Sequence, residues 1–298
     1  MSQSQTTATA IQSVLAEAME SNPAVVVLGD SVGRMGGVAG TSTGLLQTHG
    51  PDRVWDTPIA DRGTLGVALG MALGGRIAVV ELADSGRLAD AQGVLAAAGA
   101  IASRGDFAVP LIVRVPYGTE AIGVDTPVGR TLGGLPGVHI VCASDAHTAA
   151  GLLRTALAGR HPTVILEPRS IYNERSVVQT ESVPFTARTL RTGAHVTLAA
   201  WGAGVHAAAD AAEALAQEGL DAEVIDLVSV SPIDIDSLGA SVRKTGRLVV
   251  VHPADSATAD AARAIGLDQA FLYLESPLAT APESAGAVAD VARNTIHY

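Results

Sequence analysis

The sequence is poor in residue types that whole classes of protein need. It contains one lysine, one cysteine and 3% aromatic residues, against a net charge of −11. The acidic balance and the absence of a basic cluster argue against a nucleic-acid partner, which needs clustered Lys and Arg. A single cysteine allows no internal disulfide and makes thiolate metal sites improbable, and Cys142, within an apolar run, is interpreted as a buried thiol rather than a reactive one.

Long hydrophobic runs are also missing. No uninterrupted apolar stretch approaches the ~20 residues that span a bilayer, so no membrane segment is expected. Residues 1–10 are polar and lack the basic, apolar and small-residue order of a secretory signal. These two observations predict a cytoplasmic protein that does not contact a membrane.

What is present favours a two-domain α/β protein. The chain has 298 residues, of which 48% are hydrophobic and 16% charged, enough for two buried cores. Apolar runs alternate with helical patterns, which indicates parallel sheets covered by helices. We predict a first domain at 1–175, a polar and irregular linker at 176–192, and a second domain at 193–298.

The same alternation predicts individual elements. In the first domain it predicts strands at 24–28, 54–57, 77–81, 111–115, 140–142 and 163–166, and helices at 7–20, 64–73, 90–102 and 146–157. In the second it predicts strands at 196–200, 223–227 and 248–251, and helices at 204–217, 235–244 and 286–294.

One local motif suggests a nucleotide-binding site. Residues 196–207 give a strand, then G-x-G-x-x-A, then a helix, and Asp226 closes the next strand about 20 residues on. This pattern is typical of dinucleotide binding, where glycines let a pyrophosphate approach a helix N-terminus. The alternative is a tight strand-to-helix turn with no ligand. We favour the structural interpretation, because a unit of three or four strands has no room for a second nucleotide-binding half.

A more specific resemblance rests on residues 50–61, GPDRVWDTPIAD. They resemble the pattern G-P-x-R-V-F-D-T-P-I-A-E of beta subunits in pyruvate and branched-chain 2-oxoacid dehydrogenase E1 components. Residues 27–34, 135–138, 166–169 and 224–252 resemble further family segments in the same order. The resemblance implies a transketolase-like pyrimidine-binding domain, a parallel sheet with helices on both faces, followed by a smaller α/β transketolase C-terminal domain.

The resemblance also implies a cofactor and a partner. Members of that family use thiamine diphosphate, whose magnesium is held by an alpha-type subunit through a G-D-G…N-N motif. This sequence has no such motif, so it implies an alpha-type E1 or transketolase N-terminal-type partner in an alpha2beta2 heterotetramer. An acyltransferase or carrier protein is a further expected partner.

Asp61 aligns with the family glutamate that contacts the cofactor's pyrimidine N1′. That contact favours the imino tautomer, which acts as the internal base. Aspartate is one methylene shorter, and a displacement of about 1 Å is enough to cost ~100-fold in rate. The alternative role is a helix N-cap, because Asp61 lies just before the predicted helix if that helix starts near Gly63. Both interpretations stay open here.

Four further positions complete the candidate site. Asp30 aligns with a family glutamate near an acid-lined channel between sites, while Leu82 and Ser85 fall where the family has an aromatic that packs on the pyrimidine. The loop after 111–115 lacks the family histidine. Asp125 in that loop is a candidate substitute for proton transfer, although loop aspartates are more often turn formers.

These features predict an oxidoreductase or transferase component. The first hypothesis is a beta-type subunit that cleaves a 2-oxoacid or ketose, transfers the acyl or aldehyde unit, and acts on a specialised substrate. The alternative is a catalytically degenerate paralogue that keeps the fold and serves as a structural or assembly subunit. A nucleotide-binding module is the weakest hypothesis.

Overall fold

The computed structural model describes residues 3–118, 135–252 and 270–298. The chain divides into two compact units, Met1–Pro184 and Phe185–Tyr298. Among the described residues, no helix is both long and apolar enough to cross a membrane. Asp125 lies outside the described residues.

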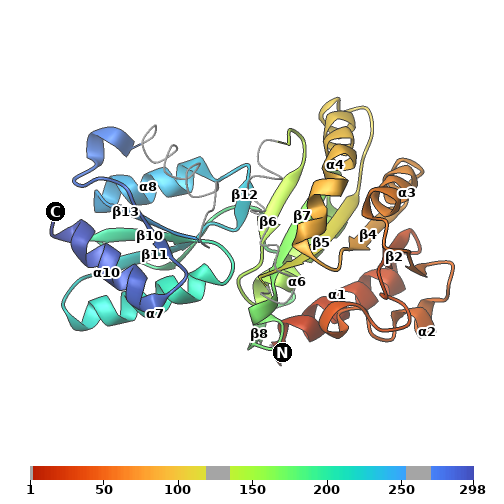
Figure 1. Cartoon of the computed structure of the whole chain (residues 1–298), viewed down its shortest axis with the longest axis horizontal. Coiled ribbons are helices and arrows are strands. Elements are labelled where there is room, and N and C mark those ends of the chain that lie inside the picture. The colour runs from red at the N-terminus through yellow and green to blue at the C-terminus, as the bar shows by residue number, and fades with distance from the viewer. Residues whose placement is uncertain (1–2, 119–134, 253–269) are drawn as a thin grey trace. The chain divides into compact units, whose positions relative to one another are not determined.

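The first unit is built on a parallel sheet (Figure 1). Its strands lie in the order β6-β7-β5-β4-β2-β3, and every neighbouring pair is parallel. The strands are β2 (Val25–Gly29), β3 (Val54–Asp56), β4 (Ile77–Glu81), β5 (Leu111–Tyr117), β6 (His139–Cys142) and β7 (Thr163–Pro168). All six were predicted. Their nearly continuous apolar runs suit strands that are buried on both faces.

Helices cover both faces of this sheet. Figure 1 shows α3 and α4 on one side of the strands and α1 and α6 on the other. The helices of this unit are α1 (Thr7–Ser21), α2 (Leu45–His49), α3 (Asp61–Leu73), α4 (Leu88–Ser103) and α6 (Ala146–Ala158), with 3-10 turns η1 (Val38–Gly40), η2 (Ser85–Arg87) and η4 (Arg169–Ile171). Local caps fix their starts: the Asp145 carboxylate accepts from the Thr148 amide at 2.6 Å.

The predicted linker is not free of regular structure. Its first residues belong to β8 (Arg175–Val178), which pairs antiparallel with β1 (Gln3–Thr6). Its last residues belong to β9 (Arg188–Arg191) of the second unit. The division at 184/185 falls between these strands. Both strands have only four residues and contain polar side chains, which is why their sequence looked irregular.

The second unit is a smaller sheet in the order β14-β13-β10-β11-β9. Its strands β10 (Val196–Ala200), β11 (Ala222–Asp226), β13 (Leu248–His252) and β14 (Ala279–Pro282) are parallel, while β9 runs antiparallel to β11. The remaining elements are β12 (Ser229–Ser231), α7 (Gly204–Gln217), α8 (Ile235–Thr245), η5 (Phe271–Tyr273) and α10 (Ala285–Ile296). Within the described residues this sheet has five strands, more than the three or four that we predicted, because β9 and β14 are edge strands without strong patterns.

Candidate functional site

The connections of the first sheet produce a topological switch point between β2 and β4. From β2 the chain crosses outward to β3, returns to the other side of β2 as β4, and then continues to β5. The loops after β2 and β4 therefore leave the sheet in opposite directions. In open α/β sheets, ligands bind outside the carboxyl ends of the strands at such a switch point. Asp30 directly follows β2, and the turn 82–87 directly follows β4.

Asp61 reaches this edge from the start of α3. It is the first residue of the helix, and the N-cap position belongs to Ala60, which has no side chain able to cap. The Asp61 side chain instead points to a guanidinium, with an Oδ2 to Arg87 Nε distance of 2.5 Å. The N-cap interpretation of Asp61 is therefore wrong. Its side chain is 10% exposed, so the carboxyl group is largely shielded from water.

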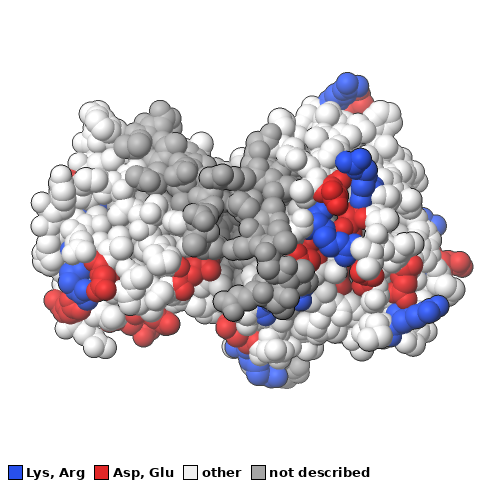
Figure 2. Space-filling view, in the orientation of Figure 1, with Lys and Arg blue, Asp and Glu red and all other residues white. Residues whose placement is uncertain are grey.

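Arg87 joins two aspartates that lie far apart in the sequence. Its Nε contacts Asp61, and its Nη1 lies 3.4 Å from Oδ2 of Asp30. A short turn fixes its position: the Asp84 carboxylate accepts from the Gly86 amide at 2.7 Å, and Leu88 anchors the following helix with a fully buried side chain. Figure 2 shows acidic and basic side chains gathered near the start of α4 within a largely uncharged surface. Sequence analysis missed Arg87.

The surroundings of Asp61 act on its pKa in opposite directions. Burial raises the pKa of the Asp61 carboxyl, the Arg87 guanidinium lowers it, and the nearby Asp30 and Asp90 carboxylates raise it further. The net result is a pKa above the ordinary 3.8. Two of these aspartates share one arginine, so their negative charge is only partly balanced.

A second arginine lies deeper at the same edge of the sheet. Arg114 of β5 is fully buried and binds Glu167 with two hydrogen bonds of 2.8 Å. Its Nη1 donates to Glu81 at 2.7 Å. Burial alone would lower the pKa of Arg114, but the two carboxylates hold that pKa above its usual value. The residue was detectable in the sequence as a charge inside the apolar run 111–115.

The glycine-rich loop after β2 is tied to this buried cluster. Glu81 accepts from the Val38 amide at 2.7 Å and from the Thr41 hydroxyl at 2.6 Å. Gly37 lies so close that an added Cβ would meet Glu81 Oε1 at 2.5 Å, and its φ is +73°. The loop therefore requires glycine at this position. This contact keeps the loop over the carboxyl ends of β2 and β4.

The remaining predicted site residues do not form an open pocket for an aminopyrimidine ring. Leu82 and Ser85 are buried, at 1% and 5% exposed, so their surfaces pack against protein. Asp30 and Asp61 do come together, through Arg87. An aminopyrimidine ring needs a free carboxyl group, and here that group is paired with an arginine. The arrangement as it stands therefore does not fit the ring, although the carboxyl group itself is present.

The glycine turn of the second unit is filled by protein. An added Cβ at Gly204 would lie 3.2 Å from the Glu283 carboxylate, which thus lies against the start of α7. Asp226 is fully buried, accepts from the Val228 amide at 3.0 Å and lies 3.9 Å from Arg188. A pyrophosphate at this turn would meet a carboxylate. The structural interpretation of G-x-G-x-x-A is the better one.

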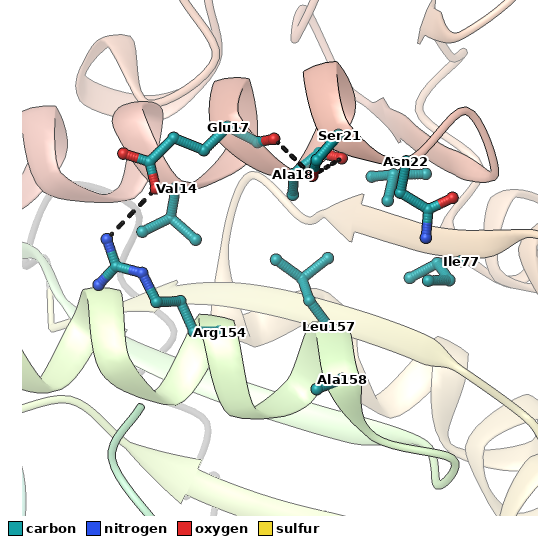
Figure 3. A pocket seen from close by; sticks show the side chains of 10 residues that line it. Val14, Glu17, Ala18, Ser21, Asn22, Ile77, Arg154, Leu157 and Ala158 are labelled. Carbon is teal, nitrogen blue, oxygen red and sulfur yellow. Dashed lines mark hydrogen bonds and ion pairs between the residues drawn. The ribbon is translucent and has the colours of Figure 1, made fainter. Parts of the chain in front are cut away.

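The first unit also contains a cavity of about 320 Å³ between α1 and α6 (Figure 3). Apolar side chains such as Val14 and Leu157 line it, and the Glu17–Arg154 ion pair of 3.5 Å lies at its edge. It lies away from the switch point. Within the described part of the chain, no group of three or more His, Cys, Asp or Glu side chains could hold a metal ion.

Comparison with known proteins assigns the fold. The pyrimidine-binding domain of transketolase matches residues 3–175, and the transketolase C-terminal domain matches residues 186–282. The pyruvate dehydrogenase E1 component subunit beta of Bacillus subtilis is 36% identical over 284 residues, covering 90% of this chain and 86% of that protein. The chain belongs to the transketolase-like E1 beta family.

Other relatives agree. The E1 beta subunit of Acholeplasma laidlawii is 34% identical over 285 residues and covers 90% of this chain and 85% of that protein. Among solved structures, a split-gene transketolase described as an inactive beta4 tetramer superimposes with a TM-score of 0.80, over 98% of both chains, at 22% identity. That likeness supports the fold of this E1 beta family member.

Proposed function

We propose that this chain is the beta-type subunit of a heteromeric thiamine-diphosphate-dependent enzyme that cleaves a 2-oxoacid or ketose and transfers the acyl or aldehyde unit. The observation that supports it is the Asp61 carboxyl group, shielded from water and held at the switch point of the pyrimidine-binding domain. Carboxyl groups with a perturbed pKa are typical of sites that handle protons. When bound, the cofactor would supply the carbanion chemistry, and this chain would supply the carboxyl group.

The proposed partner is an alpha-type subunit in an alpha2beta2 assembly. It would hold the magnesium and the diphosphate, because this chain has no G-D-G…N-N motif. The replacement of the usual site residues favours a specialised substrate. An acyltransferase or carrier protein would receive the product. Asp30, Leu82, Ser85 and Asp125 remain proposed site residues in this assembly.

A second function is supported by a specific observation. The Arg87–Asp61 ion pair withdraws the one carboxyl group that the cofactor would need. A subunit kept for assembly alone would tolerate such a pair. We propose this structural role as the alternative.

Purification of the tagged chain from its native cells distinguishes the two. Mass spectrometry would identify the copurifying chain, and the thiochrome fluorescence of the released cofactor would measure thiamine diphosphate per complex. The enzyme proposal expects a partner with the G-D-G…N-N motif and close to one cofactor per beta-type chain. A stable complex with that partner but without cofactor would contradict the enzyme proposal and support the assembly role.

A further inference from the structure

The cavity between α1 and α6 lies at the opposite end of the strands from the switch point. Its lining includes Val25 and Ile77, which are the first residues of β2 and β4. Asp30 and the turn 82–87 follow the carboxyl ends of these same two strands. A molecule bound in this cavity would therefore be separated from the candidate site by the length of the strands.

Most of the cavity wall is apolar. Its apolar side chains come from both helices and from the two strands: Val14, Ala18, Val25, Ile77, Leu157 and Ala158. The volume of about 320 Å³ is at the lower end of the range for ligand pockets, which is ~300–1,000 Å³. The cavity therefore suits a small molecule with a short aliphatic part.

Two opposite charges meet at the edge of the cavity. Among the described residues that line it, the charged side chains are Glu17 of α1 and Arg154 of α6, and Figure 3 shows them facing one another beside Val14. Glu17 Oε2 lies 3.5 Å from Arg154 Nη2, and the Glu17 side chain is 67% exposed. An exposed ion pair of this kind contributes little to stability, so a ligand can separate the two charges at small cost.

The two charged groups differ in how firmly they are held. Arg154 Nη1 donates to the Gln179 backbone oxygen at 3.3 Å, and the Arg154 side chain is 18% exposed. This contact keeps the guanidinium at the edge of the cavity when Glu17 turns away. The carboxylate of Glu17 is the more exposed of the two and has room to move. Arg154 is therefore the fixed group of the pair and Glu17 the adjustable one.

The other end of the cavity carries polar side chains without charge. Ser21 Oγ donates to the Glu17 backbone oxygen at 2.8 Å, so its hydroxyl is used within α1. Asn22 uses its side-chain oxygen to accept from the Ala24 amide at 2.9 Å. This end offers no charge to a ligand. Recognition of a charged ligand therefore depends on Glu17 and Arg154.

We propose that this cavity binds a free aliphatic amino acid such as leucine or valine. Arg154 pairs with its carboxylate, Glu17 pairs with its ammonium group, and its side chain lies against the apolar wall. A zwitterion has one charge of each sign close together, which a carboxylate beside a guanidinium matches. A simple acid would leave Glu17 facing a second negative charge, and a simple amine would leave Arg154 facing a second positive charge. This site does not depend on the proposed thiamine function.

The first test compares ligands on the purified full-length chain, with binding followed by ligand-observed NMR. Leucine should bind with a dissociation constant on the order of 0.1–1 mM, a range open to a ligand of so few atoms. The acid 4-methylpentanoate and the amine 3-methylbutylamine have a similar aliphatic part but only one charge each. Both should bind at least about tenfold more weakly, because each forms one charge-assisted contact fewer. Glycine, which has no side chain for the apolar wall, should also bind more weakly than leucine.

The second test compares variants of the chain. Glu17→Gln and Arg154→Gln should each weaken leucine binding by about tenfold. Glu20→Gln and Arg160→Gln are the matched controls, because they remove the same charges from exposed positions outside the lining, and they should leave binding unchanged. Ala18→Leu should abolish binding, because the larger side chain fills the cavity and leucine suits a helix. Circular dichroism of each variant verifies that the chain is folded.

Three results would overturn the proposal. The first is no saturable binding of leucine by the wild-type chain up to about 10 mM, ten times the weakest expected dissociation constant. The second is binding of 4-methylpentanoate or 3-methylbutylamine as tight as that of leucine, which would exclude recognition of a zwitterion. The third is an equal loss of binding in Glu17→Gln and Glu20→Gln, which would place the ligand elsewhere. The weaker binding expected of the single-charge ligands and of the two lining variants, with unchanged controls, would support the site.

Discussion

Two arginines at the carboxyl edge of the same sheet each join two acidic side chains, and they differ in depth. Arg114 lies between Glu81 and Glu167 with hydrogen bonds of 2.7–2.8 Å and no exposure. Arg87 lies between Asp30 and Asp61 with one contact of 2.5 Å, one of 3.4 Å, and solvent at its side. The two groups of charges are therefore alike in composition. We call the buried group around Arg114 the closed cluster and the partly exposed group around Arg87 the open cluster.

The difference in burial predicts that the two arginines contribute unequally to stability. Arg114 uses its three guanidinium nitrogens on its two carboxylates, and the Tyr172 hydroxyl donates to Glu167 at 2.7 Å. A buried charge with all its partners in place cannot leave without a large loss of free energy. Arg87 has one short and one longer contact and is partly exposed to water, so less of the stability is expected to depend on it.

The largest loss of stability is expected when the arginine of the closed cluster is removed. Arg114→Met leaves two carboxylates buried without their cation and should lower the free energy of unfolding by about 3–5 kcal/mol. Urea unfolding followed by circular dichroism measures this. The triple variant R114M/E81Q/E167Q, which removes all three charges, should recover part of the loss. A loss below about 1 kcal/mol for Arg114→Met would show that the cluster is not closed.

The next largest loss of stability is expected when the contact between the glycine-rich loop and Glu81 is disturbed. Gly37→Ala places a Cβ against the Glu81 carboxylate at a positive φ and should cost about 1–3 kcal/mol. Gly66→Ala is the matched control, because nothing lies within 4 Å of its added Cβ and alanine favours helices. Thermal denaturation of both variants would measure the difference. Equal melting temperatures would contradict the tight packing of the loop.

Arg87→Met should have a small effect on folding. Its ion pairs are partly exposed, so we expect the free energy of unfolding to change by about 1 kcal/mol or less. The same urea experiment measures it beside Arg114→Met. A loss as large as that of Arg114→Met would remove the distinction between the two clusters.

The smallest effect is a dependence on pH. The pKa of Asp61 is raised in the folded chain, so its contribution to stability is complete below the ordinary value of 3.8 and is lost as the pH rises through the folded-state pKa. The free energy of unfolding of wild type relative to Asp61→Asn should therefore fall as the pH rises above 3.8. Urea titrations at several pH values measure it, and a relative stability that rises with pH would contradict the assigned direction.

The sequence predicted the central strands and not the ion pairs. The strands of both sheets with long apolar runs were predicted because burial on two faces produces an unmistakable pattern. The short strands β1, β8, β9 and β14 were missed, since they contain polar residues or few residues. The resemblance pointed to Asp61, but the helix was predicted to begin at residue 64, whereas α3 begins at Asp61, and the later predicted start made the cap interpretation look equally good.

Arg87 could not have been predicted in the same way. Its partners come from a loop after β2 and from the start of α3, and only the fold brings them together. The family pattern has an aromatic where this sequence has Leu82 and Ser85, and the resemblance indicated no role for Arg87. Arg114 was open to prediction, because a charge in a buried strand requires partners, and Glu81 and Glu167 lie near the carboxyl ends of the two neighbouring strands.

The central claim is that this chain contributes half of a thiamine diphosphate site. The most direct test is calorimetric titration of thiamine diphosphate and magnesium into the purified chain and into the complex with its copurifying alpha-type subunit. We predict saturable binding to the complex and none at micromolar concentrations to the chain alone, because the magnesium and diphosphate ligands belong to the partner. Micromolar binding by the isolated chain, or no binding by the complex, would contradict the account.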